Sequence, residues 1–209
     1  PHDVVPEATQ KLHEAQGQTL IGEEAARLAS ADFVPLENPL SSDMNVLRPS
    51  LLPGLLESLR HNVGRMTEDV ALFELGRVFR KSTSSDAKAS QKKGEPAVVE
   101  TRRVAIALTG RSHPTFWTGE NRTALFDLAD LKGFLEEFLE RYGVRGMTYC
   151  TRADRTPLFV ESATIHLGRI LLGEMGHVQP ALAQRYDLRQ AVLLAELDLD
   201  ELLRRRNTG

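Results

Sequence analysis

Apolar positions along the chain follow two periods, one of about two residues and one of three to four. Strict alternation and clusters of β-branched or aromatic residues are typical of strands, whereas the longer period is typical of amphipathic helices. Alternation predicts strands over 33–36, 70–79, 103–108, 147–150, 163–167, 170–175 and 192–197. The compact turn Gly168-Arg169 joins two of these strands, so we expect a hairpin there.

The longer period predicts helices over 6–16, 23–29, 51–63, 128–142, 180–186 and 200–206. The third of these contains a proline, Pro53, and carries Leu52, Leu55, Leu56 and Leu59 at helical spacing. We expect Ser50 to be its N-cap, because proline is tolerated in a first turn, where backbone N–H groups have no intrahelical partner. Such a dense leucine face predicts helix–helix packing, with the possibility that it crosses a subunit boundary.

Hairpins interleaved with long helices predict an α+β fold, with a mostly antiparallel sheet and helices packed on one face. The length of 209 residues suits a single domain. The polar, low-complexity stretch 82–96 is predicted to be a flexible loop between two strands. Neither end of the sequence resembles a natural terminus, so we expect a fragment of a longer chain.

Composition narrows the functional classes. A net charge of −3 gives no general attraction to nucleic acid or anionic membrane. With a single cysteine, Cys150, no intramolecular disulfide can form, and we expect a reducing, cytoplasmic location. The apolar runs are shorter than the roughly 20 residues that a membrane span needs.

The residues offer no complete catalytic or metal-binding motif. The residues that could belong to a site are Cys150, His166 and His177 on neighbouring strands, His113 in a loop, the turn Ser41, Ser42 and Asp43, the glycines Gly168, Gly173 and Gly176, and the basic run Arg204, Arg205 and Arg206. Each has a structural explanation that we favour: filling a sheet, packing a loop, capping a turn, forming a hairpin, or complementing a helix dipole. We expect Glu136, Glu137 and Glu140 to form a solvated helix face. We therefore predict no catalytic, cofactor-binding or metal-binding residue.

One long segment changes this picture. The stretch LENPLSSDMNVLRPSLLPGLLESLRHNVGR, followed by VALFELGRVF, resembles the β subunit of bacterial phenylalanyl-tRNA synthetase, in particular its catalytic-like module. The later segments FDLADLKGFLEEFLERYGV and ILLGEMGHVQPALAQRYDL are similar to the same family. The resemblance covers about residues 33–203.

The resemblance implies a class II aminoacyl-tRNA synthetase-like antiparallel sheet flanked by helices. It also implies a degenerate copy of the active domain that binds neither ATP nor phenylalanine, and instead pairs with the α subunit in a heterotetramer. The whole complex uses ATP and magnesium to charge tRNA with phenylalanine. Arg77 and Arg80 lie near the place of one phosphate-binding arginine, but no glycine-rich element ending in arginine follows. Without both, adenylate chemistry lacks charge stabilisation.

We therefore predict a non-catalytic scaffold and subunit-interface module, inactive by itself. The interface or framework positions that match the family are Asn38, Pro39, Leu40, Arg48, Leu51, Pro53 and Gly54, to which we add Leu55 and Leu59 of the leucine face. Two alternatives stay open. The first is a free-standing, non-catalytic RNA-binding module, which needs a continuous basic surface. The second is a small-molecule enzyme with an unread site, which needs a pocket of converging titratable groups.

Overall fold

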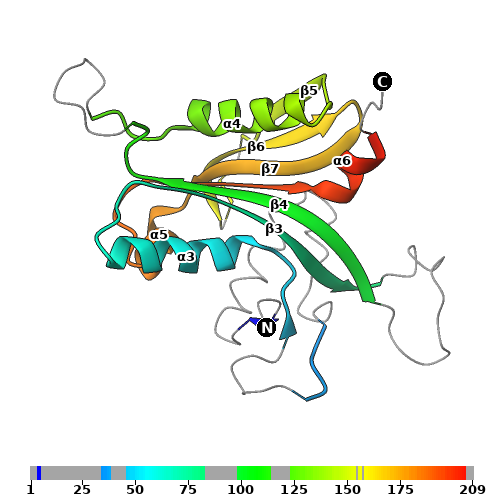
Figure 1. The fold of residues 1–209 in the computed structure, drawn as a ribbon, viewed down its shortest axis with the longest axis horizontal. Coiled ribbons are helices and arrows are strands. Elements are labelled where there is room, and N and C mark those ends of the chain that lie inside the picture. The colour runs from blue at the N-terminus through cyan, green and yellow to red at the C-terminus, as the bar shows by residue number, and fades with distance from the viewer. Residues whose placement is uncertain are drawn as a thin grey trace.

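A computed structural model describes residues 4–5, 34–38, 46–82, 98–113, 123–153, 155–156 and 158–205. Within these ranges the centre of the molecule is a six-stranded antiparallel sheet with strand order β3-β4-β8-β7-β6-β5 (Figure 1). Its strands are β3 (Val70–Lys81), β4 (Val98–Thr109), β5 (Met147–Thr151), β6 (Phe159–Leu167), β7 (Ile170–Val178) and β8 (Val192–Asp198). The helices are α3 (Leu52–Gly64), α4 (Leu128–Arg141), α5 (Pro180–Arg185) and α6 (Leu199–Arg205). Two short strands, β1 (Val4–Val5) and β2 (Val46–Leu47), pair apart from the main sheet.

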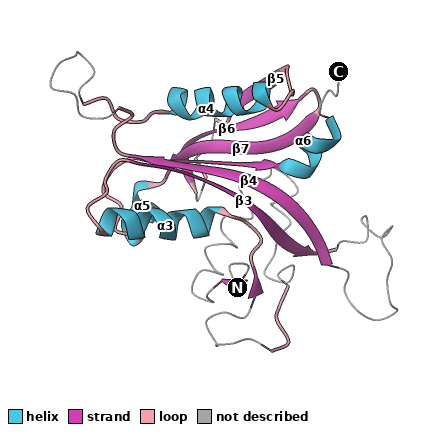
Figure 2. Cartoon of the chain, in the orientation of Figure 1, coloured by secondary structure: helices cyan, strands magenta, loops and turns pink. Residues whose placement is uncertain are grey.

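Helices cover both faces of this sheet, which corrects our expectation of helices on one face. The hydrophobic core beneath α3 and α5 lies on one side, and the core beneath α4 and α6 lies on the other. Figure 1 shows α3 and α4 on opposite sides of the strands, and Figure 2 shows the same two helical layers in cyan. The physical reason lies in β4 and β8, which bury consecutive residues. Because successive side chains in a strand point to opposite faces, both faces of these strands need cover.

The predicted elements after residue 46 are confirmed in kind and position. The long hairpin of β3 and β4 pairs from Val70 with Thr109 to Lys81 with Val98, and β6 pairs with β7 across the turn at Gly168. The predicted strand 33–36 is wrong where it is described, because Pro35 makes only an isolated bridge to Val46. The helices expected over 6–16 and 23–29, and all but the first residue of the loop 82–96, lie outside the described residues. No described helix has the length and apolar character that crossing a bilayer requires.

The start of α3 differs from the prediction by one residue. Leu51, not Ser50, is the N-cap, and it has no side chain that caps the helix. The Ser50 hydroxyl still accepts a hydrogen bond from the Leu52 N–H at 3.1 Å. Pro53 lies at the beginning of the helix, where its missing N–H removes no intrahelical bond. The helix therefore begins at Leu52 and leaves the Leu51 N–H for a partner elsewhere in the fold.

Helix α4 begins with a side-chain cap that the periodicity did not reveal. The Asp127 carboxylate accepts from the N–H groups of Ala129 and Asp130, at 2.8 and 2.9 Å. The Asp130 carboxylate accepts in return from the Asp127 N–H at 3.0 Å, which completes a capping box. At the other end, Gly143 takes a φ of 83°, the left-handed conformation that ends helices.

The leucine face of α3 packs against the sheet of its own chain. Its members are Leu52, Leu55, Leu56 and Leu59, all fully or almost fully buried. They belong to the same core as Val78 of β3 and Leu194 of β8. Each is therefore a structural contact inside this chain.

We predict that Leu59→Ala lowers the free energy of unfolding of the chain by about 2–5 kcal/mol, because it leaves a cavity in a close-packed core. Thermal and urea melts measure this loss, and Met66→Ala, at a side chain that is 93% exposed, is the control. Equal stability of the Leu59→Ala variant and the control would contradict this packing.

Candidate functional site

Charged side chains gather under the N-terminal end of α3, on the face of the sheet that this helix covers. Glu196 of β8 lies directly opposite Glu174 of β7 on one side and Ala105 of β4 on the other. Arg103 of β4 and Arg48, just before α3, supply positive charge. All four charged side chains are buried. This cluster, defined by Arg48, Arg103, Glu174 and Glu196, is the most unusual feature of the core, because charged residues are rarely buried unless paired.

Glu196 binds the start of the helix. One carboxylate oxygen accepts from the Leu51 N–H at 2.7 Å, and the Ser50 hydroxyl lies 3.3 Å from both oxygens. Burial raises the pKa of Glu196, while Arg103, the Leu51 N–H, Ser50 and Arg48 act in the opposite direction. A carboxylate at a helix N-terminus also interacts favourably with the helix dipole. Glu196 therefore satisfies the backbone N–H of the N-cap residue from a distant part of the sequence.

Arg48 joins the segment before α3 to strand β3. Its guanidinium forms an ion pair with Glu74 at 2.7 Å and donates through Nε to the Arg77 carbonyl at 3.0 Å. Its own carbonyl accepts from the Phe79 N–H at 2.9 Å. A Cβ at Gly76 would lie 2.5 Å from the Arg48 Nη2 atom, so only glycine leaves room for the arginine. Three contacts thus hold Arg48 in place, and the absence of a side chain at Gly76 leaves the space for it.

Glu174 is less well satisfied than Glu196. It is fully buried and lies 3.2 Å from an Arg152 guanidinium nitrogen, but neither carboxyl oxygen has a hydrogen bond. Burial raises the pKa of Glu174 to about 8; Arg152 opposes this shift and the neighbouring Glu196 adds to it. At neutral pH Glu174 is therefore mostly protonated, and the repulsion expected between two adjacent carboxylates is largely removed.

The geometry of this cluster suits structural support better than substrate chemistry. Glu196 and Arg48 are used by the helix start and by β3, as described above. Two nitrogens of Arg103 and the Ser162 hydroxyl are buried without a hydrogen-bond partner, and Arg103 is 3.6 Å from Asp198. The four side chains are buried and present no open face to a substrate, and two of them, Glu196 and Arg48, bond neighbouring elements together.

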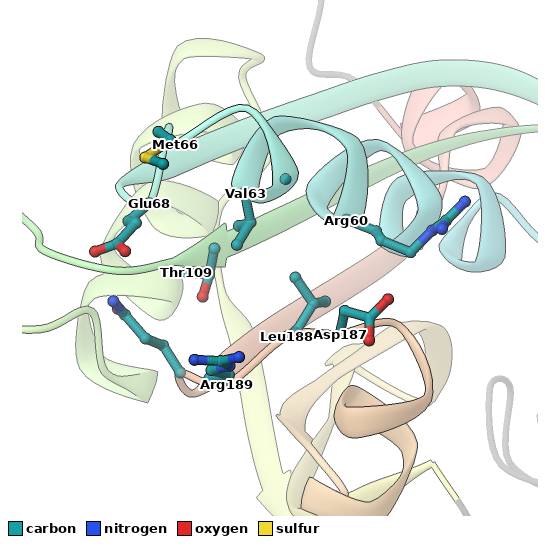
Figure 3. Close-up of a pocket in the computed structure, with 10 residues that line it drawn as sticks. Arg60, Val63, Met66, Glu68, Thr109, Asp187, Leu188 and Arg189 are labelled. Atoms are coloured by element: carbon teal, nitrogen blue, oxygen red, sulfur yellow. The ribbon is translucent and has the colours of Figure 1, made fainter.

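A cavity of about 490 Å³ opens at the other end of α3 (Figure 3). Figure 3 shows Met66 and Glu68 on one side of it and Arg60 and Asp187 on the other, with Leu188 between. Arg60 is already bonded to Glu57 at 2.8 Å. The charged groups around this cavity are of both signs, and no charged member of the buried cluster lines it. It lacks the converging acid and base that a catalytic pocket requires.

Comparison with known proteins decides the family. The family described as phenylalanyl tRNA synthetase beta chain CLM domain matches residues 8–199. The chain belongs to the phenylalanyl-tRNA synthetase beta chain CLM domain family. This confirms the resemblance found in the sequence. CLM denotes the catalytic-like module of that resemblance.

Curated relatives of this CLM domain carry the name phenylalanine–tRNA ligase beta subunit. The protein from Nitratidesulfovibrio vulgaris is 32% identical over 91% of this chain, and that from Xylella fastidiosa is 37% identical over 82%. The Bacillus subtilis protein is 34% identical over 79%. The chain spans only 23%, 20% and 19% of the lengths of these three proteins.

Solved structures confirm the fold. The pyrrolysyl-tRNA synthetase of Desulfitobacterium hafniense superimposes with a TM-score of 0.59 over 96% of this chain and 60% of that one, at 17% identity. A second structure of that synthetase gives a TM-score of 0.55, with 95% and 68% covered at 16% identity. The predicted class II synthetase-like antiparallel sheet is therefore correct.

The structure of the CLM domain brings together only part of the predicted set of interface or framework positions. Arg48, Leu51, Pro53, Leu55 and Leu59 are buried at or near α3. Asn38 and Gly54 are exposed, and Pro39 and Leu40 lie outside the described residues. The buried members hold the helix on the sheet, whereas the exposed ones do not contribute to the core.

The other candidate residues do not converge. His166 shares a 2.9 Å hydrogen bond with Thr164, Cys150 is exposed, and His177 lies opposite Glu161 and Leu193. Among the described residues no group of three or more His, Cys, Asp or Glu side chains could hold a metal ion.

Several of the other candidate charges lie in local ion pairs within the part of the domain that the structure describes. Glu136, Glu137 and Glu140 are solvated and face Lys132, Arg141 and Arg145 along or just after α4. Arg204 and Arg205 both pair with Glu201, and Arg206 lies outside the described residues. His113 is exposed, and the turn at 41–43 is not described.

Sequence reasoning missed the two buried glutamates. Each is a lone acidic residue inside an apolar strand run, in LLGEMG and LLAEL. An acid in the middle of a strand that is buried on both faces indicates a buried polar contact, because its side chain lies in the core whichever face it points to. The partner of Glu196, the Leu51 N–H, is 145 residues away, so the sequence alone does not show the contact.

We predict that stability depends on pH through Glu174. Its pKa is about 8 in the folded chain, above the ordinary value of 4.5. The folded state therefore holds a proton that the unfolded state releases, and the free energy of unfolding falls as pH rises from about 4.5 to about 8.

Glu174→Gln removes this titration, so its stability relative to the unmodified chain should rise between pH 5 and pH 8. Urea melts at several pH values measure the difference, and the exposed Glu137→Gln is the control. A constant difference over that range would contradict the assignment.

Proposed function

We propose that this chain is a non-catalytic scaffold and subunit-interface module of the phenylalanine–tRNA ligase β subunit. The complex that it supports uses ATP and magnesium to join phenylalanine to tRNA in the cytoplasm. Its direct partner is the α subunit, and tRNA is bound by the assembled complex. The family match motivates the assignment, and the use of the buried charges at the sheet centre for structural support carries the non-catalytic part of it.

Arg77, one of the two arginines nearest to a phosphate-binding position, does not join these charges. Arg77 pairs with Glu100 at 3.0 Å, and its side chain is exposed. Gly76, the preceding residue in β3, faces Arg48 beneath α3, so Arg77 points to the opposite face of the sheet. A transferring phosphoryl group needs several cationic or dipolar groups aimed at one point, and Arg77 is turned away from the buried charges.

For most of the proposed interface or framework positions, burial supports the framework role. Arg48, Leu51, Leu55 and Leu59 fix α3 on the sheet, and in this chain their side chains are already covered. A partner subunit would meet what α3 leaves exposed, including Gly54. The leucine face therefore supports the interface by fixing α3 on the sheet, and its side chains do not contact the partner subunit.

Neither alternative function gains support from the surface. An RNA-binding module needs a continuous basic surface, whereas the chain has a net charge of −3 and several of its described surface arginines, such as Arg102 and Arg111, lie beside acidic partners. A small-molecule enzyme needs converging titratable groups, which the cavity beside α3 lacks.

We predict that the chain alone shows no phenylalanine-dependent exchange between ATP and pyrophosphate, and that it co-purifies with the α subunit of the same organism. Tagged chain and α subunit, expressed together, test the pairing, and each alone is the control. Exchange by the chain alone that Arg77→Ala abolishes would overturn the non-catalytic role. Failure to pair by a chain that melts cooperatively would overturn the interface role.

A further inference from the structure

The cavity of about 490 Å³ at the end of α3 combines apolar side chains with charged groups of both signs. Val63 of α3 and Leu188, after α5, form its apolar part, and Figure 3 shows their side chains pointing toward one another. Sites for small molecules are clefts of this size, in which a few polar groups on a mostly apolar lining fix the orientation of the ligand. The polar groups of this cavity therefore decide which ligand fits.

Two charged side chains of the cavity are available to a ligand. Among the described residues, neither Asp187 nor Arg189 makes a side-chain hydrogen bond or an ion pair. Arg60 also lines the cavity, but it is bonded to a glutamate of its own helix at 2.8 Å. Glu68, the second acid of the lining, already interacts electrostatically with Arg111. One available carboxylate and one available guanidinium suit a ligand that carries one positive and one negative charge.

Gln190 adds an acceptor to these two charges. It lines the cavity, and its side-chain oxygen is buried without a hydrogen-bond partner in the part of the chain that the structure describes. A buried acceptor that lacks a donor costs free energy, and a ligand N–H placed against it recovers that cost. The ligand therefore needs an N–H group in addition to its two charges.

The backbone beside the cavity is strained at two positions. Met66 and Asp187 have φ values of 68° and 56°, and no other described residue except glycine has a positive φ. Each follows the end of a helix, α3 or α5, where glycine is the usual residue in this conformation. Both line the cavity. Strain of this kind occurs at binding sites, and here it retains an apolar side chain and the available carboxylate.

We propose that this cavity binds a zwitterionic dipeptide with apolar side chains. Asp187 binds the terminal ammonium, Arg189 binds the terminal carboxylate, and the amide N–H of the dipeptide donates to the Gln190 side chain. The apolar side chains of the dipeptide pack on Val63 and Leu188. This site is separate from the scaffold role proposed above, so its failure would leave that role intact.

Other ligand classes leave one of these groups unused. An anion bound to Arg189 would bring a second negative charge near Asp187, two residues earlier in the chain, and like charges in a binding site are repulsive. A cation bound to Asp187 would meet Arg189 in the same way. A free amino acid carries both charges, but it has no amide N–H for the buried oxygen of Gln190. The dipeptide is the smallest ligand that satisfies all three groups.

Titration of the 209-residue chain with alanyl-leucine tests the proposal, with the NMR shifts of the Leu188 and Gln190 amides as the measurement. We expect saturable binding with a Kd in the millimolar range or below. Conversion of the dipeptide's carboxylate to an amide, or acetylation of its ammonium, should each raise the Kd by about two- to fivefold, because each removes one exposed ion pair. Free leucine should bind more weakly than the dipeptide, because it lacks the amide N–H.

Matched variants assign the two ends of the ligand. Arg189→Gln should raise the Kd by about two- to fivefold, and in this variant the dipeptide and its C-terminal amide should bind equally. Asp187→Asn, which keeps a residue type that tolerates a positive φ, should do the same for the dipeptide and its N-acetyl form. Arg185→Gln is the control, since it removes an exposed arginine of α5 that does not line the cavity.

Four results overturn the proposal. Unchanged Leu188 and Gln190 amides at about 10 mM dipeptide mean that the cavity does not bind it. Equal weakening by Arg189→Gln and Arg185→Gln means a general effect of charge. Equal affinity of the unmodified chain for the dipeptide and its C-terminal amide means that Arg189 does not bind the carboxylate, and equal affinity for free leucine means that the amide is not recognised. Circular dichroism melts confirm that each variant is folded before its binding is interpreted.

Discussion

The contact between Glu196 and the residues just before α3 joins the start of this helix to strand β8. A glutamate in the middle of β8 accepts the Leu51 N–H at 2.7 Å, and thereby satisfies a backbone donor that a side-chain cap does not reach. The carboxylate is buried, so water cannot replace this hydrogen bond. Loss of the partner therefore costs more free energy of folding than at a surface. This contact fixes the start of α3 on β8, and the buried leucine face holds the rest of the helix on the sheet.

The same region shows how polar side chains at the centre of this synthetase-like sheet are used for structural support. Two of the polar side chains at the centre of the sheet are fully engaged, Glu196 with the helix start and Arg48 with Glu74 and β3. Glu174 lies beside Arg152 without a hydrogen bond, and Arg103 keeps two buried nitrogens without a partner. A catalytic site keeps such groups open to substrate and aimed at one reacting point. Here Glu196 and Arg48 support a helix and two strands. The fold is retained, and these polar groups have a structural role.

The sequence predicted the elements better than their arrangement. Alternation and helical spacing identified the β3–β4 hairpin and the α3 helix, because these periods are local properties of the chain. The helical layer beneath the second face was missed, since β4 and β8 are buried on both sides and show little alternation. Glu174 and Glu196 were missed for a related reason: a single acid in an apolar run does not reveal its partner.

The interface or framework positions show a further limit. Leu55 and Leu59 would have the same spacing whether they faced the sheet of this chain or a partner subunit, so only the packed structure separates the two roles. The Asp127 capping box, in contrast, is local, and the spacing of its two aspartates was available to read.

Hydrogen exchange at the Leu51 amide tests most directly whether Glu196 holds α3 on the sheet. Native-state exchange followed by NMR should show the Leu51 N–H protected as strongly as the amides of β8, so that it exchanges only through global unfolding. The exposed Gly54 in the same first turn is the comparison, and it should exchange much faster. If Leu51 exchanges as fast as Gly54, the helix start is not held by Glu196 and this account is contradicted.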